Sequence, residues 1–539
     1  MTEWTLAAAN DAVAAAVGDR DMVVWGADRR TYAEVGDRSR RLAGHLVARG
    51  LGLHRERAGL ERWECGQSPV ALIMANRPEY LEAMYASFRA RAVPFNVNHQ
   101  YRPHEIRALL EAIGAEAVIY QRQLAAVVGE AVAGLDLVLI DIDDGSGAEP
   151  VAGAVDYERA VEAGGPASLP EPQGDDLYMV CTGGTTGAPK GVLWRQADIF
   201  HAAMGGPEAA TAEALGTTAV ANTEGRWFAA PPLMHAAAQW TAFAGLHTGA
   251  TVVLHDDTQR FDAGAILRVA EAERISLISV VGDAYARPLV EELRRRSYDL
   301  SSLGTIGIGG AVTSEEHKLA LLELIPHVMI VDGYGASETG GMAFGARTTA
   351  SKAAGFAPGA GAVVLSADRR RLLDPGDDEV GWTARRGRVP LGYLGDPEAT
   401  ATTFPVIDGE RFAVPGDRAT LGEDGAITVL GRDSMVVNTG GEKVFVEEVE
   451  EVLRGHAAVA DALVVGRPCD RFGQEVVGVV QLRPGATATA AELREFCAGS
   501  LARFKAPRAI AYVDTIGRHP SGKPDYRWAR DAAASAEQV

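Results

Sequence analysis

Short apolar segments of strand length alternate with helical patterns along most of the chain. The segment VALIMANRP (70–78) ends in turn-forming residues, and the helix-like segment EYLEAMYASFRARA (79–92) follows it. Similar apolar runs lie at 115–121, 137–143, 251–257, 275–282 and 327–335. Strands separated by helices in this way pair in parallel and need helices on both faces of the sheet. The pattern predicts an α/β fold with stacked parallel-type sheets.

The pattern changes after about residue 356. Shorter strands and turn signals follow, which predict a small, barrel-like part. A compact α+β segment comes after GRD at 431–433, with two helices and three strands in mixed order. We therefore expect a large N-terminal body over residues 1–431 and a small C-terminal cap over residues 432–539. The Gly- and Pro-rich segment 146–176 is expected to be a surface connection.

The composition is that of a globular protein with a surplus of acidic residues. Of 539 residues, 47% are hydrophobic and 23% are charged, which excludes a largely disordered chain. The chain has 52 Lys and Arg against 72 Asp and Glu, a formal charge of −20. Nucleic acids and anionic membranes attract basic surfaces, so neither is an expected partner.

The cysteines and the N-terminus indicate a cytoplasmic protein. The four cysteines are scattered and form no CxxC pair, so a disulfide framework or a structural zinc site is not expected. The N-terminal segment reads as an Ala-rich helix without the basic start of a signal peptide. No apolar stretch approaches the roughly 18 residues that a membrane-spanning helix needs.

The strongest local signal is MVCTGGTTGAPKGVLW (179–194), where an apolar strand leads into glycines, threonines and a lysine. Glycines let the backbone approach an anion closely and present N–H groups to it. Threonine hydroxyls add donors, and Lys190 adds a point charge suited to phosphate. The Walker A pattern is not met, because Lys190 stands between Pro189 and Gly191 and a strand-like run follows. The loop predicts a phosphate site or, taken alone, a simple turn between strands.

The string TGGTTGAPKG resembles the signature loop of the adenylate-forming superfamily, which includes acyl- and aryl-CoA synthetases, luciferases and adenylation domains. Five more segments resemble motifs of that family in the right order: IGIGGAV (306–312), VDGYGASETG (331–340), VPGDRA (414–419), GRDSMVVNTGGEKVFVEEVE (431–450) and HPSGKPDYR (519–527). Six ordered matches make coincidence negligible. The resemblance implies that the body binds ATP and substrate and that the cap is mobile.

The resemblance also implies roles for single residues. Lys523 corresponds to the family's mobile catalytic lysine, and Glu338 with the Thr186 hydroxyl is implied to hold Mg²⁺. His235 resembles a gating residue beside the substrate carboxylate, although a packed histidine explains it nearly as well. The positions implied to bind ATP and CoA are Thr182, Gly183, Gly184, Thr185, Gly187, Lys190, Gly309, Gly310, Ala311, Asp332, Gly333, Tyr334, Gly335, Ser337, Asp417, Arg432, Gly441 and Lys443.

Among these positions the resemblance distinguishes several functions. Tyr334 is implied to pack on adenine, and Asp417 to accept both ribose hydroxyls. Arg432 would contact ribose or phosphate, and Gly441 and Lys443 would border the channel for the CoA thiol. Taken singly, each of these residues has an ordinary structural explanation, such as a helix cap or a surface ion pair. Because the motifs occur together and in the family's order, functional roles are favoured over these structural explanations.

The implied reaction has two halves. A carboxylate attacks the α-phosphorus of ATP and expels pyrophosphate, and the acyl-adenylate then passes its acyl group to CoA. Segments such as PPLMHAAAQW (231–240) and SGKPDYRWAR (521–530) most resemble actinobacterial fatty-acid and steroid side-chain CoA ligases. The expected function is therefore an acyl- or aryl-CoA ligase with ATP, Mg²⁺ and CoA, acting on a small-molecule carboxylate. A homodimer is left open.

Two further functions are considered. Ala236 stands where that group usually has Gly, and Val446 replaces its usual Pro. ATP-dependent diazotases, which resemble these ligases but activate nitrite for coupling to an aryl amine, are the alternative that such changes would suit. A nucleotide-binding protein without ligase activity is the third reading. The intact charged residues Lys190, Glu338 and Lys523 argue against it.

Overall fold

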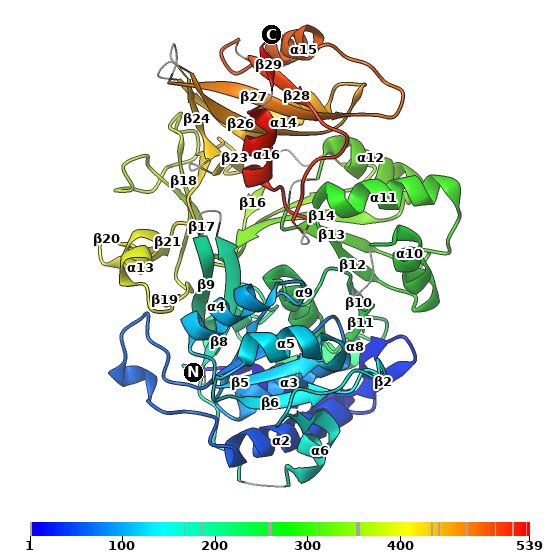
Figure 1. Ribbon diagram of the computed structural model, residues 1–539, viewed down its shortest axis with the longest axis vertical. Coiled ribbons are helices and arrows are strands. Elements are labelled where there is room, and N and C mark those ends of the chain that lie inside the picture. The colour runs from blue at the N-terminus through cyan, green and yellow to red at the C-terminus, as the bar shows by residue number, and fades with distance from the viewer. Residues whose placement is uncertain are drawn as a thin grey trace.

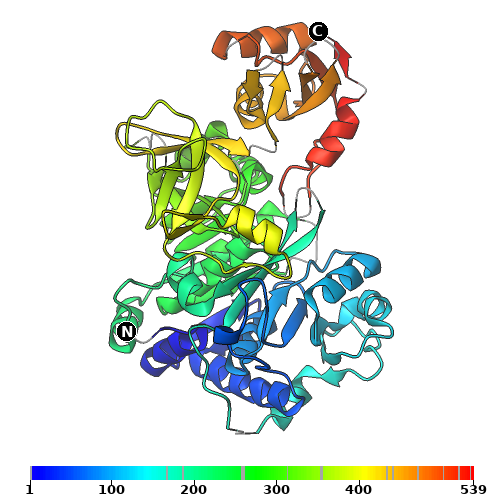
Figure 2. The same cartoon turned by 90° about the vertical axis from the view of Figure 1, so that its left-hand side faces the viewer.

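The computed structural model describes residues 3–538 except 166–167, 185–186, 257–260, 312, 352–355, 433–434, 440–441, 470–472, 502, 520–521 and 535. The N-terminal part of the chain forms a large body, and the C-terminal elements gather into a smaller unit at one end of it (Figure 1). The view turned by 90° shows the same division (Figure 2).

A large, mainly parallel sheet crosses the body. Its inner strands pair in parallel, whereas β2, β15 and β16 pair in antiparallel fashion toward the two edges. In spatial order the strands are β16 (Ala357–Pro358), β15 (Gly340–Arg347), β14 (Met329–Ala336), β13 (Thr305–Gly309), β12 (Leu277–Val280), β10 (Arg226–Ala229), β11 (Thr251–Leu254), β1 (Asp21–Trp25) and β2 (Asp28–Thr31).

A second sheet of the body pairs in parallel throughout its described strands. Its order is β4 (Val93–Asn96), β3 (Pro69–Ile73), β5 (Ala117–Gln121), β6 (Val138–Ile142) and β7 (Val155–Asp156). Both sheets contribute buried residues to one continuous apolar core, together with the helices α1 (Leu6–Val17), α2 (Tyr32–Ala48), α3 (Pro78–Arg89) and α9 (Ala236–His247). These helices therefore bury apolar faces against both sheets, as strands that are apolar on both sides require.

Further helices cover the outer faces. The larger sheet packs against α10 (Ala263–Ala272), α11 (Gly282–Arg295) and α12 (Glu315–Leu324). The second sheet packs against α4 (Pro103–Ile113) and α5 (Ala125–Val132). The remaining helices of the body are α6 (Tyr157–Ala163), α7 (Gln196–Ala202), α8 (Ala212–Ala221) and α13 (Pro397–Thr403).

The glycine-rich segment forms a hairpin of β8 (Leu177–Gly184) and β9 (Gly187–Arg195), with Thr182 opposite Lys190. The short strand β19 (Gly392–Tyr393) pairs with β9 and extends this sheet. The antiparallel, turn-rich part of the body contains β17 (Ala362–Leu365), β18 (Gly381–Arg386), β20 (Val406–Ile407), β21 (Glu410–Ala413), β22 (Asp417–Leu421) and β23 (Ile427–Arg432).

The C-terminal unit builds its own sheet and core. Its strands are β24 (Val437–Thr439), β25 (Glu442–Val444), β26 (Val459–Cys469), β27 (Gly473–Leu482), β28 (Ala509–Tyr512) and β29 (Glu537–Gln538). The helices are α14 (Val446–Arg454), α15 (Ala490–Ser500) and α16 (Tyr526–Ala533). Val446 is buried in this core, which explains an apolar residue at that position.

The architecture follows the sequence-based expectation with one clear exception. The segment 146–176 is not only a surface connection, because it contains β7 and α6. The Asp156 side chain caps α6 by accepting the N–H of Arg159, and Tyr157 and Val161 are buried. The surrounding Gly and Pro residues hid this short amphipathic helix. The proposed boundary between residues 431 and 432 stays a prediction.

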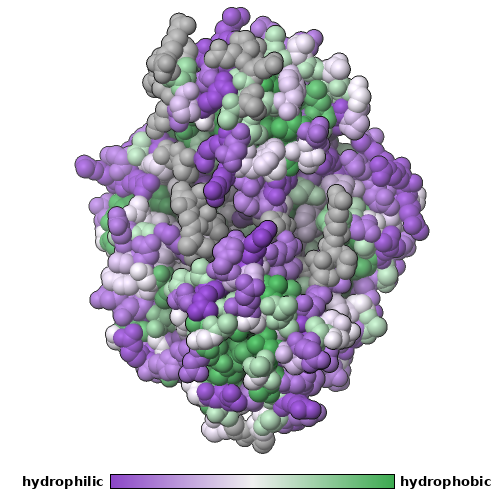
Figure 3. All heavy atoms as spheres, viewed as in Figure 1, coloured by the Kyte–Doolittle hydropathy of each residue, from purple (hydrophilic) through white to green (hydrophobic). Residues whose placement is uncertain are grey.

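The surface agrees with the composition. On the face seen in Figure 3, hydrophilic residues predominate, and hydrophobic ones gather over the lower part of the body. Among the described residues, each helix is too short or too polar to traverse a lipid bilayer.

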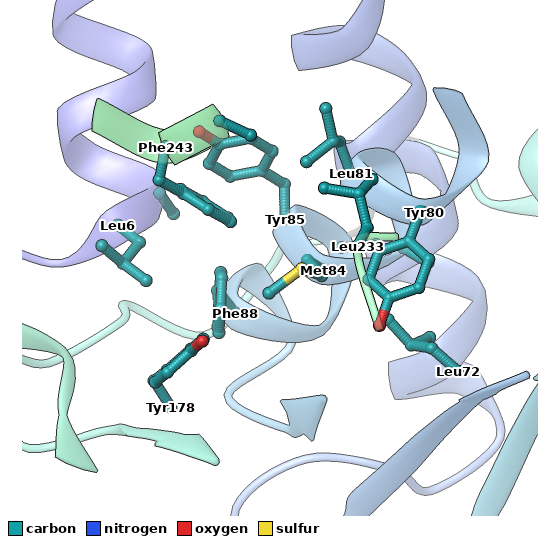
Figure 4. Packing of buried hydrophobic residues seen from close by; sticks show 14 of the residues in the cluster. Leu6, Leu72, Tyr80, Leu81, Met84, Tyr85, Phe88, Tyr178, Leu233 and Phe243 are labelled. Atoms are coloured by element: carbon teal, nitrogen blue, oxygen red, sulfur yellow. The ribbon is translucent and has the colours of Figure 1, made fainter. Parts of the chain in front are cut away.

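Aromatic side chains dominate the centre of the main core. Phe243 of α9 lies 5.3 Å from Tyr85 and 6.3 Å from Phe88 between ring centroids, and both partners belong to α3 (Figure 4). All three side chains are fully buried. This contact joins α3 to α9, although the two helices are far apart in the sequence.

We expect Phe243→Ala to lower the free energy of unfolding of the body by about 3–5 kcal/mol, because the vacated volume cannot be refilled in a close-packed core. A urea titration followed by tryptophan fluorescence measures the change. Leu319→Ala is the control, since Leu319 is 50% exposed and its truncation should cost little. Equal midpoints for the two variants would contradict the expectation.

Candidate active site

The first part of the site lies at the end of β13, beside the last residues of β14. Gly309 stands opposite Gly333 in this register, so two of the predicted motifs meet here. The next residue of β14, Tyr334, points its hydroxyl at the turn-rich part of the body. It donates a hydrogen bond to Asp417 Oδ2 at 2.5 Å and lies 2.9 Å from the hydroxyl of Thr383. Burial and the Asp417 carboxylate raise the pKa of Tyr334 well above its usual value, so it remains a donor.

Asp417 also binds the cation at the end of β23. Its Oδ1 lies 3.3 Å from Nε of Arg432, and the register of β22 and β23 places these two residues opposite each other. The neighbouring carboxylates Asp417 and Glu338 raise the pKa of Arg432 against the opposing effect of burial. The predicted ribose-side residues thus form one linked group.

Glu338 lies in the turn between β14 and β15. Its Oε1 accepts a hydrogen bond of 2.8 Å from the hydroxyl of Tyr393. Lys190 of the glycine-rich hairpin lies 5.1 Å from the centroid of the same tyrosine ring and forms a 2.9 Å ion pair with Asp396. Sequence reasoning missed Tyr393 and Asp396, because a single tyrosine or aspartate in a turn-rich segment carries no signal of its own.

Two buried side chains hold the backbone around Glu338. The indole N–H of Trp194, in β9, donates to the carbonyl oxygen of Ser337 at 2.9 Å. Nη1 of Arg385 donates to the carbonyl oxygens of Thr339 and Gly341, both at 2.8 Å. A buried guanidinium that donates to several carbonyl groups adds to the hydrogen bonds that the turn makes between Ala336 and Thr339. Neither residue was singled out from the sequence.

Lys523 of the C-terminal unit reaches the same region. It sits in a turn in which His519 N–H donates to the carbonyl of Lys523 at 2.9 Å, and Gly522 N–H returns a bond of 2.8 Å to His519. Gly522 has φ +79° and lies so close to Ala284 of α11 that a side chain would clash. The turn therefore needs glycine to pack against the body.

The charge of Lys523 interacts with Arg432 and Glu338. Burial among protein atoms and the like charge of Arg432 lower the pKa of Lys523, whereas Glu338 opposes that effect. The residue as a whole is exposed to solvent. Arg432 and Lys523 thus lie near the carboxylates of Asp417 and Glu338, and both cations are placed to contact an anionic ligand.

His235 lies next to this group at the start of α9. Burial is the main cause that lowers its pKa to about 4, and Lys523 and His99 add to the effect, so the imidazole is neutral at pH 7. Its Nε2 is buried and has no hydrogen-bond partner among the described residues. The structure thus places His235 near Lys523, and its gating role stays a prediction.

The other predicted positions have mixed outcomes. Asp332 forms an ion pair with Lys318 of α12. Gly310 has φ +75°, and Gly310 and Ala311 directly follow β13. Gly335 and Ser337 belong to the end of β14 and the turn after it. Thr185, Thr186 and Gly441 lie outside the described residues, as do the side chain of Lys443 and the surroundings of Gly183, Gly184 and Gly187.

Further contacts join the C-terminal unit to the body. Arg483 forms a 2.8 Å ion pair with Glu316 of α12. Arg454 of α14 interacts electrostatically with Asp283 of α11, and the Asp283 carboxylate accepts from His317 at 2.7 Å. These contacts hold the C-terminal unit in the orientation that brings Lys523 to Glu338.

Comparison with known proteins identifies the family. A family model described as AMP-binding enzyme matches residues 10–387, and one described as AMP-binding enzyme C-terminal domain matches residues 448–523. This chain belongs to the AMP-binding enzymes. The expected resemblance to the adenylate-forming superfamily is confirmed. Neither match reaches residues 431–432, so the boundary remains untested.

Curated relatives match over nearly the full length. The chain is 45% identical over 546 residues to the medium-chain acyl-CoA ligase Mig of Mycobacterium avium, covering 99% of both chains. It is 36% identical over 524 residues to the 3-oxocholest-4-en-26-oate–CoA ligase of Rhodococcus rhodochrous, covering 93% of this chain and 91% of that protein. The expected class, an adenylate-forming ligase of the acyl-CoA synthetase type, is confirmed. The diazotase alternative finds no support.

Solved structures confirm the fold. The o-succinylbenzoate CoA synthetase of Bacillus subtilis superposes with a TM-score of 0.77 at 22% identity and covers 100% of this chain and 99% of its own. An anthranilate CoA ligase in complex with anthranoyl-AMP reaches a TM-score of 0.82 at 20% identity and covers 99% and 98%. The α/β body with its small C-terminal unit is therefore the architecture of this family.

One carboxyl group at the junction has an unusual environment. Glu447, in the first turn of α14, packs against Gly431 at the end of β23, and its buried Oε2 has no hydrogen-bond partner among the described residues. Burial raises the pKa of Glu447 from 4.5 to about 7, although the amide of Arg432 and the Arg432 charge favour the anion. Asp417, Glu450 and Tyr526 also face this carboxyl group.

Because the folded chain keeps Glu447 protonated up to about pH 7, it binds more protons there than the unfolded chain, and stability falls as pH rises from about 4.5 to 7. We expect Glu447→Gln to match the unmodified chain at pH 5 and to melt about 2–4 °C higher at pH 7.5. Thermal unfolding by fluorimetry at both pH values measures this. Glu451→Gln, at an exposed site on the same helix, should keep the original pH dependence. A Glu447→Gln variant with unchanged pH dependence would refute the assignment.

Proposed function

We propose that this enzyme activates a medium-chain fatty acid or a steroid side-chain acid and transfers it to CoA. The relatives in Mycobacterium and Rhodococcus are named as CoA ligases for acids of these two kinds. Those proteins match nearly the whole chain. The observation that carries the proposal is the meeting of Lys523 and Arg432 at Glu338, next to the bonded pair of Asp417 and Tyr334. Cations for phosphate oxygens and a carboxylate for ribose hydroxyls are what a nucleoside triphosphate needs.

ATP binding follows from the positions of these groups. We assign the ribose hydroxyls to Asp417, whose orientation is fixed by Tyr334 and Arg432. Adenine would lie beside Tyr334 and the ends of β13 and β14, where glycines leave room for a planar base. The ammonium group of Lys190 would give up its ion pair with Asp396 and bind the β- and γ-phosphates instead. The phosphates are the stronger partner because they carry more negative charge.

The residues present also fit Mg²⁺. Glu338 offers a half-buried carboxylate with one oxygen engaged by Tyr393, and a hard cation on a nucleotide takes one or two carboxylates together with phosphate oxygens and water. We assign Glu338, with the Thr186 hydroxyl, to hold Mg²⁺. When bound, Mg²⁺ neutralises charge on the phosphates.

Lys523 would stabilise the charge that develops in the first half-reaction. A carboxylate oxygen of the substrate attacks the α-phosphorus, the bond to the pyrophosphate oxygen breaks, and the acyl-adenylate remains. A cation between the attacking carboxylate and the α-phosphate lowers the barrier because it is already in place when the charge forms. His235, neutral at pH 7, would border the carboxylate without adding a competing charge.

The second half-reaction needs a different arrangement. The CoA thiolate attacks the acyl carbon and expels AMP, so the thiol must approach where Lys523 now lies. We propose that residues 432–539 turn about the link at 433–434, which lies outside the described residues, and bring Gly441 and Lys443 to the thiol channel. A small unit joined by one short link can turn as a rigid body.

A panel of acids tests the proposed substrates. Pyrophosphate release is followed with octanoate, decanoate, a steroid side-chain acid and benzoate, with and without CoA, and products are identified by mass spectrometry. Medium-chain or steroid acids should release pyrophosphate, and their thioesters should form only with CoA. Turnover of benzoate alone would overturn the acid class, and pyrophosphate release with none of the acids would overturn the function.

We expect Lys523→Ala to slow acid-dependent pyrophosphate release by about 10³-fold, which corresponds to about 4 kcal/mol of transition-state stabilisation. Thiolysis of a supplied acyl-adenylate should change little, because it does not use this lysine. Lys505→Ala is the control, since Lys505 belongs to the same unit but pairs with Glu448. An unchanged rate of pyrophosphate release in Lys523→Ala would remove Lys523 from the proposed mechanism.

A further inference from the structure

Tyr393 joins two parts of the site that are distant in sequence. It lies in the short strand β19, opposite Val192 of β9, and the next residue, Leu394, donates its N–H to Gly191 at 2.8 Å. Its turn is therefore bonded to the glycine-rich hairpin immediately after Lys190. The side chain is only 8% exposed, so its direction is fixed by packing.

The hydroxyl and the ring of Tyr393 contact different residues. The hydroxyl donates to Glu338 Oε1 at 2.8 Å, and the ring lies 5.1 Å from Nζ of Lys190. The direction of this bond is fixed by chemistry, because a phenol can donate and a carboxylate can only accept. A neutral donor on one carboxylate oxygen fixes the rotation of the group and leaves its negative charge available to a cation.

We propose that Tyr393 is a positioning residue of the adenylation reaction, which orients the Glu338 carboxylate toward the nucleotide-bound metal while its ring supports Lys190 of the glycine-rich hairpin. The inference rests on the proposed function, because it assumes that Glu338 faces Mg²⁺ on ATP. It assigns to Tyr393 a role exerted through Glu338 and not by contact with the reacting atoms.

A purely structural role is the competing explanation. The ring packs 5.5 Å from that of Phe404, and the amide of Tyr393 donates to the hydroxyl of Thr400 at 2.9 Å. Both contacts survive in Tyr393→Phe, which removes the hydroxyl and with it the hydrogen bonds to Glu338 and to the side chain of Thr403. The variant therefore separates orientation of Glu338 from packing of the turn.

The test measures binding of a non-hydrolysable ATP analogue by calorimetry, once with Mg²⁺ and once with EDTA. We expect Tyr393→Phe to weaken binding about tenfold with Mg²⁺, equivalent to about 1.4 kcal/mol, and less than twofold with EDTA. The Mg²⁺ concentration for half-maximal pyrophosphate release should rise by about the same factor. Equal losses in both buffers, or none, would overturn the proposal.

Two further variants complete the experiment. Tyr120→Phe removes another buried hydroxyl, in β5 of the second sheet, which accepts a hydrogen bond from the N–H of Val151. This variant should leave Mg²⁺-dependent binding unchanged. In a Glu338→Gln background, adding Tyr393→Phe should have no further effect, because both changes act on the same carboxylate. Additive losses would overturn the proposal. If the unmodified enzyme fails to bind the analogue, the proposed function fails instead.

Discussion

The pairing of the carboxylates Asp417 and Glu338 with the cations Arg432 and Lys523 is the interaction on which this site depends. Asp417 binds Arg432 and Tyr334, and Glu338 interacts with Arg432 and Lys523. In a partly buried position each charge is costly without its partner. The pairs therefore favour one arrangement of segments that are far apart in the chain.

The body supplies the rigid frame for these charges. Trp194 and Arg385 fix the backbone beside Glu338, and Tyr393 ties the same carboxylate to the glycine-rich hairpin. The net charge of −20 has no influence at this level, because a few positioned cations decide the local potential. An acidic enzyme can thus bind an anionic substrate.

The contacts of the C-terminal unit belong to one orientation. The ion pair between Arg483 and Glu316 is exposed, and exposed pairs contribute about 1 kcal/mol or less. Glu447 lies against Gly431 with its pKa raised by burial to about 7, so its charged form is costly there. Weak or costly contacts of this kind are easily exchanged, which suits a unit that must present two different surfaces to one site.

The sequence by itself determined the α/β class and the order of the functional motifs, because apolar periodicity and loop chemistry are local properties. Lys190 was recognised from the chemistry of its loop, and Glu338, Asp417, Arg432 and Lys523 from the resemblance of their motifs to the family, whereas the short helix α6 was hidden by its Gly- and Pro-rich surroundings. Only the tertiary structure decided which of these residues meet and what supports them. Tyr393 contacts Glu338, 55 residues earlier, because β19 pairs with β9. Partners at such separations are chosen by strand pairing and packing, which no local pattern records.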